Sequence, residues 1–151
     1  MVVGLPTLGL SFASMVAARL GQTRYVPFGY SRKFWYDEAL SEPVASITSP
    51  EAGKRLRLDP NLLPLFEGRR ALIVDDAIST GMTAVASVRL LQRLGIELAG
   101  MVVAMKQTNR WQAPLRTAAP ALIVRSVYGC PMFRRGEGGW WPMAETLPEV
   151  P

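Results

Sequence analysis

Two adjacent carboxylates, Asp75 and Asp76, follow the apolar residues 71–74 and precede a short segment of hydroxyl residues with one glycine. The apolar run predicts a buried parallel strand, and the acids then lie at the carboxyl edge of the sheet, where open α/β sheets bind ligands. A helix-like run begins near Thr83, and a helix N-terminus presents free N–H groups to a phosphate. Acids for sugar hydroxyls beside a phosphate cradle predict a phosphorylated sugar as the ligand.

An acid at the end of a strand also occurs in metal-binding, nucleotide-hydrolase and phosphoacceptor sites. Residues 79–83 favour a phosphate site over these alternatives, because their three hydroxyls and one glycine can surround one phosphate with O–H and N–H donors. No Gly-Lys-Ser/Thr of a P-loop occurs in the chain. The alternative is an ordinary βα turn in which Thr80 or Thr83 caps the helix, and it leaves the acid pair unexplained.

The composition excludes several kinds of chemistry. The chain has no histidine and a single cysteine, Cys130, so Ser-His-Asp and Cys-His catalysis and His- or Cys-ligated zinc are excluded. Hydrophobic residues make up 49% and charged residues 19% of its 151 residues, as in a folded single domain. The net charge of +5 comes from small basic groups rather than one run, which favours an anionic small molecule over nucleic acid.

Strands and helices are predicted to alternate along the chain, which favours a parallel sheet in an α/β domain. Strands are expected over residues 1–4, 25–28, 70–75, 98–105 and 121–124, and helices over 11–21, 83–94 and, as a short one, 109–117. The intervening segment from Gly29 to Gly68 is rich in proline and charge. There, residues 44–49 and 54–58 predict a hairpin around a turn at 50–53, followed by a short helix over 60–66, and the tail from Tyr128 is expected to be loop.

Residues 71–83 resemble the phosphoribosyl-pyrophosphate (PRPP) signature of the type I phosphoribosyltransferases. That pattern is four apolar residues, an acidic pair, two apolar residues, small hydroxyl residues, glycine, any residue, and Thr or Ser. The resemblance implies a three-layer α/β domain with a central parallel sheet and a flap β-hairpin. It implies one domain over residues 1–151, with a core over 1–125, a flap over 30–60 and a C-terminal hood or tail over 126–151.

The resemblance also implies roles for the signature residues. Asp75 and Asp76 would be catalytic residues beside the ribose 2′- and 3′-hydroxyls, and Mg²⁺ would bridge the pyrophosphate and ribose oxygens, with the two aspartates as possible further ligands. A base nitrogen would attack C1′ of the ribose as pyrophosphate leaves. The 5′-phosphate would be wrapped mainly by backbone amides of Ala77, Ile78, Ser79, Thr80, Gly81, Met82 and Thr83.

Two further segments resemble the family. Residues 2–9 are similar to its first strand and pyrophosphate loop, with Pro6, Thr7, Leu8 and Gly9 facing the diphosphate. The segment from Ser31 to Lys54 is similar to the flexible loop of adenine phosphoribosyltransferases. There Glu51 would be a catalytic residue that assists the base, with a solvated turn acid as the alternative. Arg32, Lys33 and Lys54 would neutralise pyrophosphate when the flap closes.

Residues near the C-terminal half have weaker assignments. Lys106 follows a predicted strand where some relatives contact base or pyrophosphate, and the alternative is an ordinary lysine at a strand exit. The aromatic residues of the tail would stack on a nucleobase as part of the hood, or else pack at an interface; they are Tyr128, Phe133, Trp140 and Trp141.

The expected function is transfer of phosphoribose from PRPP to a nucleobase, a purine, with release of pyrophosphate. Its alternative is a non-catalytic PRPP-binding regulatory protein, which is favoured by Thr7 and Leu8 where adenine-type members carry arginine. A third reading, an acid-pair phosphohydrolase, would release inorganic phosphate. Ser79 replaces the aspartate of hypoxanthine-guanine enzymes, which argues against that subclass.

The expected setting is a cytoplasmic homodimer without membrane or nucleic-acid partners. The chain has no basic secretory leader and no apolar stretch of about 18 residues. Members of the family normally carry a helix and hood segment before the first core strand, whereas Met1 begins that strand here. A fragment, a misassigned start and a degenerate member are the three explanations left open.

Overall fold

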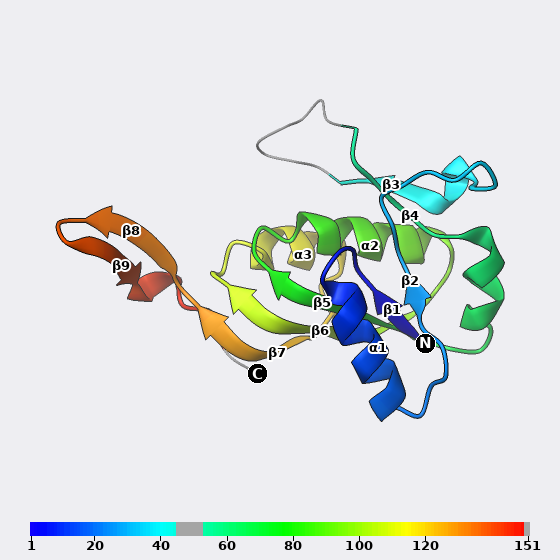
Figure 1. Ribbon diagram of the computed structural model, residues 1–151, viewed down its shortest axis with the longest axis horizontal. Coiled ribbons are helices and arrows are strands. Elements are labelled where there is room, and N and C mark those ends of the chain that lie inside the picture. The colour runs from blue at the N-terminus through cyan, green and yellow to red at the C-terminus, as the bar shows by residue number, and fades with distance from the viewer. Residues whose placement is uncertain (45–52, 150–151) are drawn as a thin grey trace.

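A five-stranded parallel sheet forms the centre of the protein, described over residues 1–44 and 53–149 in a computed structural model (Figure 1). All four neighbouring pairs run parallel, in the order β2-β1-β5-β6-β7. This arrangement confirms the predicted α/β class. The strands are β1 (Val2–Gly4), β2 (Val26–Pro27), β5 (Ala71–Ile78), β6 (Leu98–Gln107) and β7 (Val124–Cys130).

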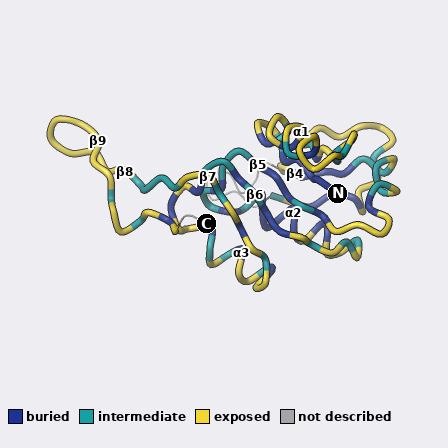
Figure 2. Tube along the Cα trace, turned by 90° about the horizontal axis from the view of Figure 1, so that it is seen from below, coloured by how far each residue is buried: buried dark blue, intermediate teal, exposed yellow. Residues whose placement is uncertain are grey.

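Helices cover both faces of this sheet, which confirms the three-layer arrangement (Figure 2). Successive strand residues point to opposite faces, so Val2 and Val74 pack with α1 (Gly9–Arg19), whereas Val3 and Ile73 pack on the other side. That other side carries α2 (Met82–Arg93) and α3 (Gln112–Ala118). No helix in the described part of the chain is both long and apolar enough to cross a membrane.

A small two-stranded sheet stands where the flap hairpin is expected. It pairs β3 (Ser41–Pro43) antiparallel with β4 (Arg55–Arg57), between the 3₁₀ helices η1 (Glu38–Leu40) and η2 (Pro60–Phe66). The second predicted strand, 54–58, contains β4. The first, 44–49, is wrong at Val44, because β3 ends one residue earlier, at Pro43; residues 45–49 and most of the turn at 50–53 lie outside the described residues.

The C-terminal segment differs from the expected loop. The last core strand, β7, begins at Val124 rather than residue 121 and continues to Cys130, beside β6 along its whole length. A second hairpin follows, made of β8 (Met132–Gly136) and β9 (Gly139–Met143), with η3 (Ala144–Thr146) after it. This hairpin projects away from the body of the molecule (Figures 1 and 2), and none of its residues is buried.

Candidate active site

The acid pair lies inside β5, three residues before the strand ends at Ile78. The expectation of a strand ending at residue 75 is therefore wrong. The strand continues because β6 runs alongside it, pairing Ala77 with Met105 and Ile78 with Lys106. Asp75 is buried, with 8% of its surface exposed, and its Oδ1 accepts a hydrogen bond of 2.9 Å from the backbone N–H of Asp76.

The carboxyl group of Asp75 is held in its neutral form by its surroundings. Burial, and secondarily the neighbouring carboxyl of Asp76, raise the pKa of Asp75 to about 8. At neutral pH this side chain therefore carries a proton and can both donate and accept hydrogen bonds. A hydroxyl-rich ligand, or a cation that arrives with it, would meet one protonated carboxyl group rather than two adjacent negative charges.

The loop between β1 and α1 lies directly against the acid pair. Leu5 donates its N–H to the carbonyl of Val74 at 2.9 Å, and the peptide bond from Pro6 to Thr7 is cis. A Cβ on Gly9 would lie 2.6 Å from Oδ1 and 2.8 Å from Cα of Asp75, so only glycine fits there. The structure thus places Gly9 of the predicted loop against Asp75 of the predicted acid pair.

The residues after the acid pair enclose a cavity of about 170 Å³. Gly81 has a φ of +79° and immediately precedes α2, which has no side-chain cap. The alternative of Thr80 or Thr83 as an ordinary N-cap is therefore wrong, and no side chain among residues 1–44 and 53–149 caps the first N–H groups of α2. The walls come from Asp75, from all seven residues predicted to wrap the phosphate (Ala77, Ile78, Ser79, Thr80, Gly81, Met82 and Thr83), and from Ala84 and Met101.

Two residues of this region went unnoticed in the sequence. Arg110 lies between β6 and α3, and its Nη2 donates to Oγ of Ser79 at 3.4 Å. Trp111 is buried and packs on Gly81, where an added Cβ would lie 3.1 Å from the tryptophan Cβ. Their position in the sequence could have indicated them, because they follow β6, the strand next to β5, and so lie at the same edge of the sheet as the acid pair.

The predicted flap cations lie elsewhere. Arg32 Nε is 3.2 Å from Oε1 of Glu38, whose carboxylate also pairs with Arg55 and Arg57. The hydrogen bond from Arg57 is the main cause of the lowered pKa of Glu38. Lys54 places its Nζ 3.8 Å from the ring centre of Tyr30. Lys33 is exposed, and within the described residues no hydrogen bond or ion pair joins Arg32, Lys33 or Lys54 to the signature residues. Glu51 lies outside the described residues.

Lys106 pairs with the wall residue Ile78 but does not itself line the cavity, and no residue of the aromatic tail lines it either. Lys106 is buried at the end of β6, and its Nζ donates to the backbone carbonyl of Glu149 at 3.1 Å. Burial lowers its pKa. Trp140 and Trp141 lie on the projecting hairpin with 67% and 56% of their surfaces exposed, and the described contacts place neither beside the signature residues.

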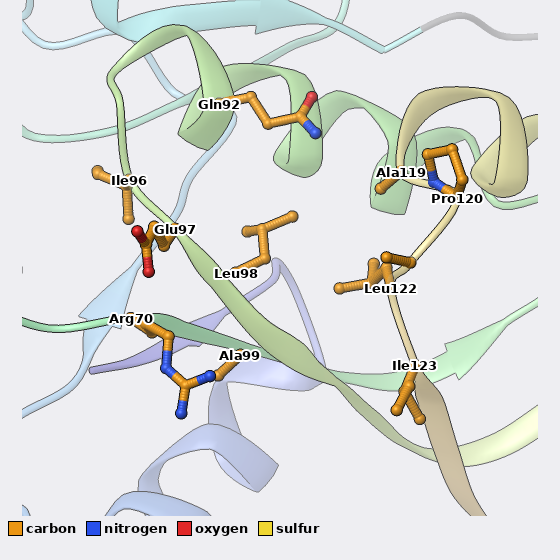
Figure 3. A pocket seen from close by; sticks show the side chains of 11 residues that line it. Arg70, Gln92, Ile96, Glu97, Leu98, Ala99, Ala119, Pro120, Leu122 and Ile123 are labelled. Atoms are coloured by element: carbon orange, nitrogen blue, oxygen red, sulfur yellow. The ribbon is translucent and has the colours of Figure 1, made fainter.

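A larger cavity, of about 470 Å³, lies at the opposite edge of the sheet (Figure 3). Arg70, just before β5, Leu98, at the start of β6, and Leu122, just before β7, line it. These are the amino ends of parallel strands, whereas ligands of such sheets bind at the carboxyl ends. The smaller cavity beside Asp75 is therefore the better candidate for a substrate site.

The side chains of this site could hold a hard cation such as Mg²⁺ only if a bound substrate supplied further oxygen ligands. Within residues 1–44 and 53–149 no group of three or more His, Cys, Asp or Glu side chains could hold a metal by itself. Asp75 supplies carboxyl oxygens to the cavity wall, and Asp76 follows it in the strand, so a Mg²⁺ ion there would keep several waters and be held mainly through substrate phosphates.

The chain is similar in sequence to known proteins. The family model described as phosphoribosyl transferase domain matches residues 1–121. An adenine phosphoribosyltransferase of Thermosynechococcus vestitus is 33% identical over 108 residues, which are 72% of this chain and 59% of that protein. The chloroplastic amidophosphoribosyltransferase 1 of Arabidopsis thaliana is 29% identical over 130 residues, 85% of this chain and 19% of that one. The chain thus spans less than two thirds of the length of these relatives.

The fold is also similar to that of a solved structure. The crystal structure of adenine phosphoribosyltransferase from Rhodothermus marinus superposes with a TM-score of 0.66 and 30% sequence identity. The alignment covers 85% of this chain and 68% of that one.

Proposed function

Because the chain belongs to the phosphoribosyl transferase domain family, we propose that it transfers phosphoribose from PRPP to a nucleobase and releases pyrophosphate. The acceptor in this proposal is a purine, which is supported by the similarity to adenine phosphoribosyltransferases. The observation that carries the proposal is the cavity of about 170 Å³ between Asp75 and the N-terminus of α2.

In this proposal the chain's own groups bind and orient the two ends of the sugar phosphate. Asp75 and Asp76 hydrogen-bond the ribose hydroxyls, and the amides and hydroxyls of the signature loop hold the 5′-phosphate. The loop from Pro6 to Gly9 receives the pyrophosphate beside Asp75, which is supported by the contact of Gly9 with that side chain. Fixing the ribose at both ends leaves C1′ in a single orientation toward the base, and such positioning can supply much of the rate enhancement.

The proposal extends to a metal ion, the flap residues and the assembly. Mg²⁺ would be held by PRPP oxygens, water and the oxygens of Asp75 or Asp76, and when bound it would neutralise charge on the leaving pyrophosphate. Glu51 would assist the base, and Arg32, Lys33 and Lys54 would meet the pyrophosphate on closure of the flap. Arg32 would first have to leave Glu38, since the two are paired at 3.2 Å. A cytoplasmic homodimer completes the proposal, on the strength of the family resemblance.

A second candidate is a PRPP-binding regulatory protein without catalytic activity. The observation in its favour is the pyrophosphate loop, where Thr7 and Leu8 are exposed and neither carries a charge. A loop without a cation binds pyrophosphate less tightly, so PRPP would be held chiefly by its ribose 5-phosphate end.

A pyrophosphate-release assay separates the two candidates. The chain would be incubated with PRPP, Mg²⁺ and a panel of purine and pyrimidine bases, and PRPP binding would be measured by calorimetry in parallel. Base-dependent pyrophosphate release supports the transferase. Saturable PRPP binding without turnover supports the regulatory protein. If neither PRPP binding nor pyrophosphate release is observed, the proposed function is wrong.

A further inference from the structure

The candidate phosphate cavity has no cation among its own wall residues. Its lining consists of the segment from Asp75 to Ala84, without Asp76, and of Met101; none of these is lysine or arginine. A dianionic phosphate held only by neutral donors would leave its charge poorly compensated. A positive group within reach of the cavity would therefore contribute both affinity and selectivity for phosphorylated ligands.

Arg110 lies where it could supply this positive charge. Its guanidinium contacts Oγ of Ser79, a wall residue of the cavity, at 3.4 Å. Within the described residues no carboxylate lies within 4.0 Å of the Arg110 guanidinium, so its charge is not neutralised by an ion pair there. The contact also has a direction: because Ser79 Oγ accepts from Arg110, the serine's own proton remains free to donate into the cavity.

The turn that carries Arg110 is fixed by several contacts. Thr108 is buried with a φ of +63°, and its N–H donates to the carbonyl of Cys130 at 2.8 Å. The Arg110 N–H lies 3.3 Å from Oγ1 of Thr108, and the indole N–H of Trp111 donates to the Thr108 carbonyl at 2.9 Å. Trp111 in turn packs on Gly81 of the cavity wall. Arg110 therefore extends from a rigid turn packed on the signature loop.

We propose that Arg110 is a positioning residue for the terminal phosphate of the sugar ligand, which orients the Ser79 hydroxyl and supplies the positive charge that the cavity wall lacks. The inference rests on the proposed function, since it takes a 5′-phosphorylated ribose as the occupant of the cavity. It adds a selectivity element contributed by the turn after β6, outside the signature.

The test measures binding of ribose 5-phosphate and, separately, of pyrophosphate with Mg²⁺ by calorimetry. Arg110→Gln is expected to weaken ribose 5-phosphate binding about tenfold or more, as for a lost charged hydrogen bond, and to change pyrophosphate binding less than about twofold. Arg110→Lys is expected to recover part of the loss, because it restores the charge but not the planar donor geometry. The matched control is Arg116→Gln, which removes one exposed arginine from α3.

The outcomes separate the two proposals. An unchanged affinity of Arg110→Gln for ribose 5-phosphate, or an equal loss in Arg116→Gln, overturns the role of Arg110 and leaves the proposed function standing. Equal losses for ribose 5-phosphate and pyrophosphate in Arg110→Gln also overturn it, because they show a general charge effect. A wild-type chain that binds neither ligand overturns the proposed function and this inference together.

Discussion

At the scale of single residues, the acid pair is the element on which the proposed site depends. Asp75 and Asp76 are sequence neighbours in a strand, so their side chains leave the backbone on opposite sides. One backbone hydrogen bond, from the Asp76 N–H to Asp75 Oδ1, still joins the two residues. Of the two, only Asp75 lines the candidate cavity, so it is the acid that the structure places directly against a ligand there.

Replacing both acids tests the site directly. Asp75→Asn with Asp76→Asn keeps the side-chain volumes but replaces both carboxyl groups by amides, and PRPP affinity is expected to fall at least about tenfold, since each hydrogen bond lost to a ribose hydroxyl costs about 0.5–1.5 kcal/mol. Circular dichroism and thermal unfolding should show an intact fold. Unchanged PRPP affinity by calorimetry would mean that the site has been assigned to the wrong residues.

The protonation of Asp75 predicts how stability depends on pH. Its pKa is raised from 3.8 to about 8 in the folded protein, so between these values the folded chain keeps a proton that the unfolded chain has lost. Its contribution is fully present below pH 4 and is lost as pH rises through 8, at a slope of at most about 1.4 kcal/mol per pH unit.

Chemical denaturation between pH 5 and 8 measures this slope. Asp75→Asn mimics the neutral carboxyl group. In this variant the free energy of unfolding is therefore expected to fall less steeply between pH 5 and 8, and to exceed that of the wild type at pH 8, because the raised pKa of Asp75 no longer contributes. Glu97→Gln, which changes an exposed acid, should keep the wild-type slope. The same slope in wild type and Asp75→Asn would show that Asp75 is ionised in the folded protein.

At the scale of elements, the start of α2 couples the fold to the cavity. Gly81 has a φ of +79° and lies against Trp111, whereas Gly95 has a φ of +72° at the other end of α2 and no atom within 4 Å of an added Cβ. The two glycines therefore share the backbone conformation and differ in their neighbours, which makes them a matched pair.

Alanine at each position separates backbone strain from the fit of the cavity wall. Gly95→Ala is expected to cost about 1–3 kcal/mol of unfolding free energy through its left-handed conformation alone. Gly81→Ala adds the contact with Trp111, about another 1–3 kcal/mol, and should weaken ribose 5-phosphate binding at least about tenfold. Urea unfolding and calorimetry measure both effects. Equal ligand affinity in the two variants would contradict a close fit at Gly81.

The elements that the sequence predicted well are those that are buried on both faces. The strands β5 and β6 lie in the middle of the sheet and read as apolar runs, so their existence and direction could be predicted. The edge strand β7 has only one neighbouring strand and contains the polar residues Arg125 and Ser126, so its sequence is not a continuous apolar run. The strand was therefore predicted too early, over the apolar residues 121–124. The projecting hairpin has no buried residue and hence no core-facing pattern to read.

The candidate site divides in the same way. The acids and the loop after them are contiguous in sequence, so their chemistry could be recognised without coordinates. The contact of Arg110 with Ser79 spans 31 positions and depends on how β6 aligns with β5, which no local pattern specifies. The pairing of Arg32 with Glu38 was missed as well, because the sequence offered no sign that the charge of Arg32 is engaged within its own segment.

At the scale of the whole molecule, the chain consists of a compact core with one projecting hairpin. The β8–β9 hairpin pairs Arg134 with Trp141 and Arg135 with Trp140, and none of its residues is buried. Its base is held by Thr146, whose Oγ1 accepts from the N–H of Met132 and donates to the carbonyl of Met143, both at 2.7 Å. After it the chain returns to the sheet edge, where Lys106 binds the carbonyl of Glu149.

This arrangement predicts that the hairpin can be removed without loss of the core or of the phosphate cavity. Met132 and Met143 are paired across the hairpin, so two glycines should connect residues 131 and 144 in place of residues 132–143. The melting temperature is expected to stay within about 3 °C of the wild type, since a change of 1 kcal/mol shifts a domain of this size by about 2–4 °C. Ribose 5-phosphate affinity should be unchanged, because no hairpin residue lines the cavity. If the deletion instead abolished ribose 5-phosphate binding in a folded protein, the hairpin would have to contact the cavity, which would contradict this prediction.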